Sequence, residues 1–335
     1  MTTDAENLHR DAIVIDGVCP LLMEPANVTY YMDGGLTAAV PTIAIRETAE
    51  QTLRIFGRWH RFIDGHGRLR LARKASDIEA AKQTGDMAIV FHFQGTDAVE
   101  DDLNLLDAYK ALGLGMVQLT YNVKCRVGDG ALERTDAGLS LFGQDLVRRC
   151  NDLRLIVDGS HTGERTTLDA MEVCDGPFVF SHANAKALHP SPRNITDGQM
   201  KACAQTGGVV GINGFPSFLG DDPRPSLERF IEFIDYAVDL IGIDHVGLGI
   251  DYYMGMDPII PADKARARYD DAIKTGRWDA AVYPPPPHYF PKGIETPATL
   301  SNLTAGLLAR GYGDTDVRKI MGENWLRVFR QVWGD

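Results

Sequence analysis

Two histidines, each following a short apolar run, are the first residues in the sequence that suggest chemistry. The run Leu155–Asp158 is followed by Gly-Ser-His161, and the run Phe178–Ser181 is followed directly by His182. Neutral imidazoles at strand ends are common zinc ligands. Either histidine alone is more often a rim residue bonded to the backbone, but the two together favour a metal site.

Asp251 and Arg193 add a carboxylate and a guanidinium to this set. Asp251 ends the run His245–Asp251, where a general acid/base or a metal ligand would stand, with a loop cap as the ordinary alternative. His245 begins that run, so we expect it at the opposite end of the strand in a structural role. Arg193 lies in a proline-rich loop after His182 and could bind a substrate carboxylate, although a lone loop arginine is usually a solvated charge.

Three further polar residues lie at or just beyond the ends of predicted strands. His92 and Gln94 share one face of the strand predicted at Met87–His92, because side chains alternate along a strand. They could be a metal ligand and a residue that orients it or, equally, satisfied polar core residues. Tyr121 follows the next strand and could donate a hydrogen bond to a developing oxyanion, or simply fill the mouth of a barrel.

The five cysteines are an odd, scattered set without C-x-x-C spacing, which argues against a disulfide framework. Cys19 and Cys125 follow strands and could border a site. We expect three others to be buried apolar fillers on helices: Cys150, Cys174 and Cys203. Four histidines lie in polar surroundings and are expected at the surface: His9, His60, His66 and His288.

The elements that would position these residues alternate between short apolar runs and amphipathic segments. We predict strands at Ala12–Ile15, Met87–His92, Gly115–Thr120, Leu155–Asp158, Phe178–Ser181, Gly208–Ile212 and His245–Gly249. We predict helices at Asp102–Leu112, Gly143–Leu153, Thr166–Glu172, Asp197–Gln205, Leu227–Ile241 after a cap at Ser226, Thr299–Gly311 and Asp314–Val332. This alternation predicts an α/β fold with a parallel sheet. Seven or eight such units without a dinucleotide-binding glycine fingerprint favour a (β/α)8 TIM-like barrel.

Length and composition exclude several classes of protein. The chain has 335 residues, 44% hydrophobic residues and a net charge of -12. These values argue against disorder and against nucleic acid or an anionic membrane as main partner. We find neither a membrane-length apolar run nor a signal-peptide pattern, and expect a cytoplasmic protein. We expect one domain over residues 1–335, with a helical C-terminal region at about 294–335 and Tyr283–His288 as a loop.

Several separated motifs together resemble the membrane (renal) dipeptidase family of zinc peptidases, and in particular its soluble bacterial branch. The resemblance covers nearly the whole chain. The motifs that carry it are Ile15-Asp-Gly17, Met32-Asp-Gly-Gly35, Gly138-Leu-Ser-Leu-Phe-Gly143, Asp158–His161, Phe180-Ser-His182, Ser191-Pro-Arg-Asn194, His245–Asp251, Gly293-Ile-Glu-Thr-Pro297 and Met321-Gly-Glu-Asn-Trp-Leu-Arg327.

This resemblance implies a (β/α)8 barrel of the metallo-dependent hydrolase type with two zinc ions at its mouth, bridged by a carboxylate. The family's histidine ligands to the second zinc match His161 and His182. Its acid/base aspartate matches Asp251, and its arginine for the substrate carboxylate matches Arg193. The resemblance also suggests a homodimer.

The sequence departs from the family pattern at the first metal site. Where the family has Asp-Gly-His-x-Asp, this chain has Asp16-Gly-Val-Cys19-Pro20, so both ligands are missing. Gln94 replaces the bridging glutamate, Tyr121 replaces a histidine that polarises the substrate carbonyl, and Cys125 replaces an asparagine. A neutral glutamine cannot neutralise two zinc ions. We infer that the first metal site does not form.

Three functional hypotheses follow. The first is a hydrolase of a dipeptide or a related small amide with a carboxylate, with one zinc ion rather than two, or none. Its metal ligands would be His161 and His182, with His92 as a further contributor. The second is a lyase, isomerase or tailoring enzyme on the same scaffold, in which Cys19 or Cys125 reacts. The third is a metal-free pseudo-enzyme that binds a carboxylate ligand through Arg193. In all three, Gln94, Cys19 and Cys125 border the bound substrate or ligand.

Overall fold

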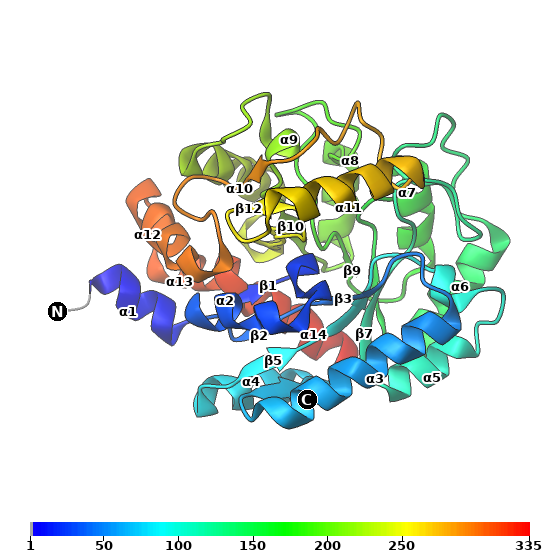
Figure 1. Ribbon diagram of the computed structural model, residues 1–335, viewed down its shortest axis with the longest axis horizontal. Helices are drawn as coiled ribbons and strands as arrows, with labels where there is room; N and C mark the ends of the chain where they lie inside the picture. Colours follow the sequence, from blue (N-terminus) through cyan, green and yellow to red (C-terminus); the bar gives the residue numbers. More distant parts are fainter. Residues whose placement is uncertain (1–2) are drawn as a thin grey trace.

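Short parallel strands surrounded by helices form the centre of the molecule (Figure 1). The protein is described by a computed structural model that covers residues 3–335. The strands are β1 (Ile15–Asp16), β2 (Ala38–Ala39), β3 (Thr42–Ala44), β4 (Leu69–Leu71), β5 (Met87–Ile89), β6 (Phe91–Phe93), β7 (Leu114–Gln118), β8 (Ile156–Asp158), β9 (Phe178–Val179), β10 (Val210–Ile212), β11 (Val246–Leu248), β12 (Met256–Asp257) and β13 (His288–Tyr289).

The strands close into a ring. They form two parallel sheets, in the orders β10-β11-β1-β2-β5-β4 and β3-β6-β7-β8-β9. Two strands of the ring belong to both sheets. One consists of β2 and β3, which are separated only around Pro41, and the other consists of β5 and β6, which are separated only at Val90. The ring closes between β9 and β10, where Phe180 donates to the Val209 carbonyl at 3.0 Å and accepts from Gly211 at 2.8 Å. The predicted parallel α/β barrel is confirmed, and β4 lies outside the ring as an additional strand on β5.

Side chains fill the barrel in layers that become polar toward one end. Along the third strand of the ring, Ala88 and Val90 belong to an apolar cluster at the bottom. His92 and Gln94, which share their parity, are also buried and lie nearer the other end. Since the carboxyl ends of all the parallel strands meet at that end, polar residues at or just after strand ends converge there.

The helices surround this ring, and several of them were not predicted. Predicted bounds match for α8 (Asp197–Gln205) and for α10 (Leu227–Ile241), which Ser226 caps as expected. Of the helices that were not predicted, the three longest are α3 (Ala49–His66), α4 (Ala75–Thr84) and α11 (Ala262–Lys274). The other helices are α1 (Asp4–Asp11), α2 (Val28–Asp33), α5 (Leu105–Ala111), α6 (Leu141–Asp152), α7 (Glu164–Val173), α9 (Pro216–Leu219), α12 (Ser301–Arg310), α13 (Asp314–Arg318) and α14 (Asn324–Trp333).

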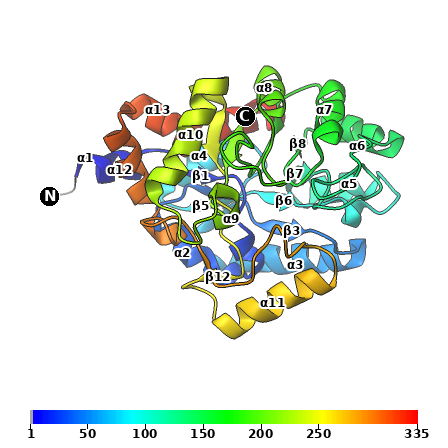
Figure 2. The same ribbon diagram turned by 90° about the horizontal axis from the view of Figure 1, so that it is seen from above.

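The C-terminal helix seals the bottom of the barrel. The prediction of one helix over Asp314–Val332 was wrong, because a wider turn at Lys319–Glu323 separates α13 from α14. A Cβ atom on Gly322 would lie 2.5 Å from the Ile13 carbonyl oxygen, so this turn comes very close to the chain entering β1. Beyond it, Trp325 is fully buried and donates to the Leu248 carbonyl at 2.9 Å. Figure 2 shows this C-terminal end and α11 on opposite sides of the strands.

Two histidines expected at the surface are buried. His9 lies 2.7 Å from Thr304 Oγ1 and 2.8 Å from the Gly34 carbonyl oxygen, and these contacts satisfy both ring nitrogens. His288 is 2% exposed and hydrogen-bonds to the Pro284 carbonyl. The expectation of surface positions was wrong because His9 joins α1 to distant parts of the chain and His288 packs against the Tyr253 hydroxyl. Among residues 3–335, no helix is both long enough and apolar enough to cross a membrane.

Candidate active site

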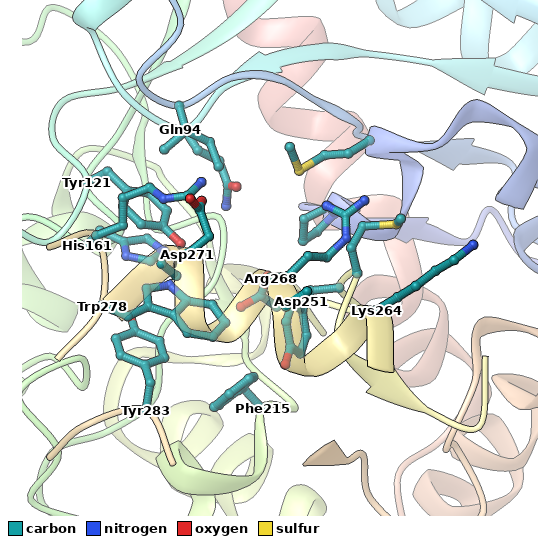
Figure 3. Close-up of a pocket in the computed structure, with 18 residues that line it drawn as sticks. Gln94, Tyr121, His161, Phe215, Asp251, Lys264, Arg268, Asp271, Trp278 and Tyr283 are labelled. Atoms are coloured by element: carbon teal, nitrogen blue, oxygen red, sulfur yellow. Dashed lines mark hydrogen bonds and ion pairs between the residues drawn. The ribbon is translucent and has the colours of Figure 1, made fainter. Parts of the chain in front are cut away.

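A cavity of about 530 Å³ lies at the carboxyl ends of the barrel strands (Figure 3). Gln94, Tyr121, His161 and Asp251 reach it from beyond β6, β7, β8 and β11. The opposite wall comes from α11 and the loop after it. The remaining lining residues are Pro20, Met23, Ile45, Phe215, Tyr253, Met254, Lys264, Ala267, Arg268, Asp271, Ala272, Arg277, Trp278 and Tyr283.

His161 lines this cavity and has one ring nitrogen without a proton. Asn122 donates its amide N–H to the Arg277 carbonyl at 2.8 Å, so its oxygen faces His161 Nδ1, 2.7 Å away. His161 therefore donates through Nδ1 and keeps a lone pair on Nε2. Burial, and after it the positive charge of Arg193, lowers the pKa of His161 well below its usual value, which keeps the ring neutral.

His182 is fixed in the same tautomer by a chain of hydrogen bonds. Ser181 donates its hydroxyl proton to Asp158, so Ser181 Oγ accepts from His182 Nδ1 at 2.7 Å. The lone pair of His182 is then on Nε2. Burial, followed by the charge of Arg193, lowers the pKa of this histidine as well. The two imidazoles have ring centroids 4.8 Å apart. Two neutral histidines, each with its lone pair on Nε2, thus lie side by side.

Gln94 faces His182 with its amide nitrogen. Thr42 donates to the side-chain oxygen of Gln94 at 3.0 Å, which turns the NH2 group toward His182. That nitrogen lies 3.4 Å from His182 Nε2 and donates to it. The lone pair that would face a metal ion is therefore hydrogen-bonded to a neutral amide.

Arg193 is a buried cation with unused hydrogen-bonding capacity. The residue is 2% exposed, its Nε donates to the Tyr283 hydroxyl at 3.1 Å, and its guanidinium lies over the ring of Phe218. Its Nη2 atom is buried and has no hydrogen-bond partner among residues 3–335. Buried charges of this kind are costly unless they are paired. The site is therefore prepared to receive an anionic group.

Asp251 and Tyr121 have the protonation states needed for proton transfer and hydrogen-bond donation. Asp251 accepts a hydrogen bond from Asn213 at 3.2 Å. Burial raises the pKa of Asp251 to about 7, although Arg193 opposes the shift. The Tyr121 hydroxyl accepts from Trp278 Nε1 at 3.0 Å, so its own proton remains available. Burial also raises the pKa of Tyr121, which keeps the hydroxyl neutral.

Backbone conformation also marks this site. Asn122, His161 and Asp251 have φ angles of +65°, +61° and +70°. Such left-handed backbone is uncommon in residues other than glycine and tends to occur at functional sites. Three of the five such residues between positions 3 and 335 thus belong to the cavity or directly support it.

Five of the nine predicted site residues do not line the cavity. Arg193 and His182 lie behind the lining residues Tyr283 and His161, which they contact. The other three are His92, Cys19 and Cys125. His92 is fully buried beneath it, with Nε2 3.1 Å from Asp158 Oδ2, so its contact is with the residue that orients Ser181. The buried Cys19 thiol donates to the Asp16 carbonyl and accepts from the Val40 amide. Cys125 lines a neighbouring pocket that shares Tyr121 with the cavity.

Several residues of the site were not predicted from the sequence. Asn122 fixes the tautomer of His161, and Tyr283 holds Arg193. Tyr283 begins the proline-rich segment that was interpreted only as a loop. Trp278 and Phe215 complete the lining. An asparagine after a tyrosine at a strand end was a signal for Asn122, but no local pattern indicates the aromatic residues.

A parallel barrel with histidines and an aspartate at its mouth is the architecture of metal-dependent hydrolases. The sequence model of the membrane dipeptidase family (peptidase family M19) matches residues 3–263 and 287–333 of this chain. The chain belongs to this family and is a hydrolase of the dipeptidase type.

Individual relatives agree with this assignment. Dipeptidase tcpJ of Claviceps purpurea is 30% identical over 268 residues, which cover 79% of this chain and 56% of the relative. An amidohydrolase structure from Pseudomonas aeruginosa is 32% identical with a TM-score of 0.91, covering 99% of this chain and all of the other. The structure of dipeptidase AC, a metallopeptidase of family M19, is 25% identical with a TM-score of 0.81, covering 97% of this chain and all of the other.

The residues present do not fit a two-metal centre. Val18 and Pro20, at the positions that the resemblance assigns to the first metal site, have side chains that cannot bind a metal, and both are buried. Across residues 3–335, no group of three or more His, Cys, Asp or Glu side chains is arranged to hold a metal ion. His161 and His182 offer two nitrogen ligands, fewer than the three protein ligands of a usual catalytic zinc site.

Proposed function

We propose that this protein hydrolyses the amide bond of a dipeptide or a similar small molecule with a free carboxylate. The observation that carries the proposal is the unpaired Nη2 of buried Arg193 next to the cavity. A substrate carboxylate would pair with this guanidinium and relieve an uncompensated charge. The amide bond next to that carboxylate would then lie among His161, Tyr121 and Asp251.

Each of the nearby side chains has a role that its environment supports. Asp251 accepts a proton from the attacking water, because its pKa of about 7 suits a general base near neutral pH. Tyr121 donates a hydrogen bond to the carbonyl oxygen as negative charge develops there. His161 and His182 would hold one metal ion, which we expect to be zinc. When bound, such an ion supplies Lewis-acid polarisation.

The alternative in which Cys19 reacts receives no support from its surroundings. Burial is the largest of the effects that raise the pKa of the Cys19 thiol well above its usual value, and the charge of Asp16 adds to it. A reactive cysteine needs an accessible thiolate. Cys125 is half-buried in the neighbouring pocket, with Sγ 3.6 Å from Thr96 Oγ1.

A panel of dipeptides with L- and D-residues, each tested beside its C-terminal amide, examines the proposed function. We expect free dipeptides to be hydrolysed and their amides, which lack the carboxylate, to react at least about 30-fold more slowly. Arg193→Lys should cause a loss of the same size, because an ammonium on a shorter stem cannot replace the guanidinium fork. Arg266→Ala, on the outer side of α11, is the control and should leave the rates unchanged. Equal rates for dipeptides and their amides would contradict the role of Arg193.

A further inference from the structure

The segment 264–286 supplies much of the cavity although it lies outside both stretches that match the family. Eight of the eighteen lining residues belong to it. They are Lys264, Ala267, Arg268, Asp271, Ala272, Arg277, Trp278 and Tyr283. Figure 3 labels five members of this set around the cavity: Lys264, Arg268, Asp271, Trp278 and Tyr283. Residues outside the common family pattern therefore shape the space where this chain would bind its substrate.

The apolar part of this space is a continuous aromatic wall, made of Phe215, Tyr253, Trp278 and Tyr283. Trp278 and Tyr283 stack with ring centroids 4.5 Å apart and planes 7° apart. Tyr253 lies 5.5 Å from Trp278 and 5.6 Å from Phe215. Because all four rings line the cavity and pack on one another, their free faces form one surface for a flat apolar group.

The aromatic wall adjoins the proposed carboxylate site. Arg193 Nε contacts the Tyr283 hydroxyl at 3.1 Å, and its guanidinium lies over Phe218. Phe218 in turn has its ring 4.9 Å from that of Phe215. A substrate carboxylate bound to Arg193 would therefore lie beside the wall. The side chain of the substrate residue that bears this carboxylate would then contact the wall.

We propose that the aromatic wall selects substrates whose carboxylate-bearing residue has an aromatic side chain. This inference deepens the proposed function and rests on it. Trp278 is the central specificity residue, because it joins the stacked pair to Tyr253 and also donates to Tyr121 at 3.0 Å. The substrate class is a dipeptide-like amide ending in Phe, Tyr or Trp, in place of one with two small residues.

Binding and turnover of matched dipeptides test this proposal separately. Ala-Ala, Ala-Phe, Ala-Trp and the positional control Phe-Ala, each in both configurations at the terminal residue, are titrated calorimetrically into Asp251→Asn protein. Turnover is measured with the unaltered protein. We expect Ala-Phe and Ala-Trp to bind at least about tenfold more tightly than Ala-Ala, as the burial of an aromatic ring predicts. Phe-Ala should gain less than threefold.

Two substitutions at one position separate the aromatic surface from the hydrogen bond to Tyr121. In Asp251→Asn protein, Trp278→Ala should reduce the preference for Ala-Phe over Ala-Ala to less than about threefold, because the wall loses its central ring. Trp278→Phe keeps a ring without the N–H group and should retain most of the preference. Arg266→Ala, on α11 and outside the cavity, should retain all of it.

The outcomes distinguish this inference from the proposed function. Tighter binding of Ala-Phe without any turnover would support the aromatic wall and contradict the hydrolase assignment. Turnover of all four peptides without a preference would support the hydrolase and overturn the wall. Equal gains for Phe-Ala and Ala-Phe would overturn the placement beside Arg193. Loss of the preference in Trp278→Phe protein would overturn the role of the aromatic surface, because that variant keeps a ring and loses only the N–H group.

Discussion

Gln94 shows how one side chain changes the chemistry of a site. An amide and a carboxylate have the same shape, but the Gln94 amide donates to His182 Nε2, where a carboxylate could only accept. The replacement therefore removes a negative charge and also occupies a metal-binding lone pair. The sequence alone predicts the loss of charge. The direction of the amide depends on Thr42, which lies 52 residues earlier in the chain, and so could not be predicted.

The substitution Gln94→Glu should increase metal affinity. The new carboxylate would face the Nε2 lone pair of His182 without a proton between them, and a divalent cation would relieve the repulsion. We expect zinc to bind at least about tenfold more tightly, as measured by competition with a chromophoric chelator. Gln94→Ala, which only removes the amide, serves as control. Unchanged affinity in Gln94→Glu protein would contradict the proposed position of the metal.

Asp251 should determine the acidic limb of the pH–activity profile. Its pKa of about 7 means that the basic carboxylate form becomes more populated as the pH rises through neutrality. The rate constant kcat/KM should therefore rise with pH and level off above about 7. Asp251→Asn should lower the rate at least about 100-fold and abolish this limb. A limb that persists in the variant would assign the titration to another group.

Individual elements could be predicted where local signals agreed with the final packing. α8 and α10 have caps and regular apolar spacing, and their bounds follow from the sequence. The strand formed by β2 and β3 was missed because Pro41 interrupts it. α11 was missed because few of its residues are apolar, and its inner face lines the cavity. Such an element depends on tertiary context more than on its own pattern.

The contact of α14 with the barrel should contribute strongly to stability. Trp325 fills the bottom of the ring so tightly that a Cβ atom on Gly17 would lie 2.5 Å from its ring. Trp325→Ala should destabilise the protein by about 3–5 kcal/mol, because it leaves a large cavity and removes one of the hydrogen bonds to the Leu248 carbonyl. Trp278→Ala makes the same chemical change at a partly exposed position and should cost less. Thermal unfolding of both variants measures the difference, and equal losses would contradict this account.

The barrel as a whole could be predicted more completely than its site. Alternation of strands and helices predicts the ring, and the convergence of strand ends predicts that His161 and Asp251 share one cavity. The contacts that set their chemistry come from distant loops. Asn122 orients His161, and Trp278 lies 157 residues from its partner Tyr121. No pattern within one segment indicates such pairs, so the roles of these residues required the folded chain.

A zinc titration of metal-free protein, followed by dipeptide hydrolysis at each step, tests the central claim most directly. The claim is that this dipeptidase-type hydrolase works with a single metal site built on His161 and His182. We expect activity to rise linearly and level off at about one zinc per chain, with no rise in His161→Ala protein. Activity that continues to rise until about two ions per chain are bound would contradict the claim.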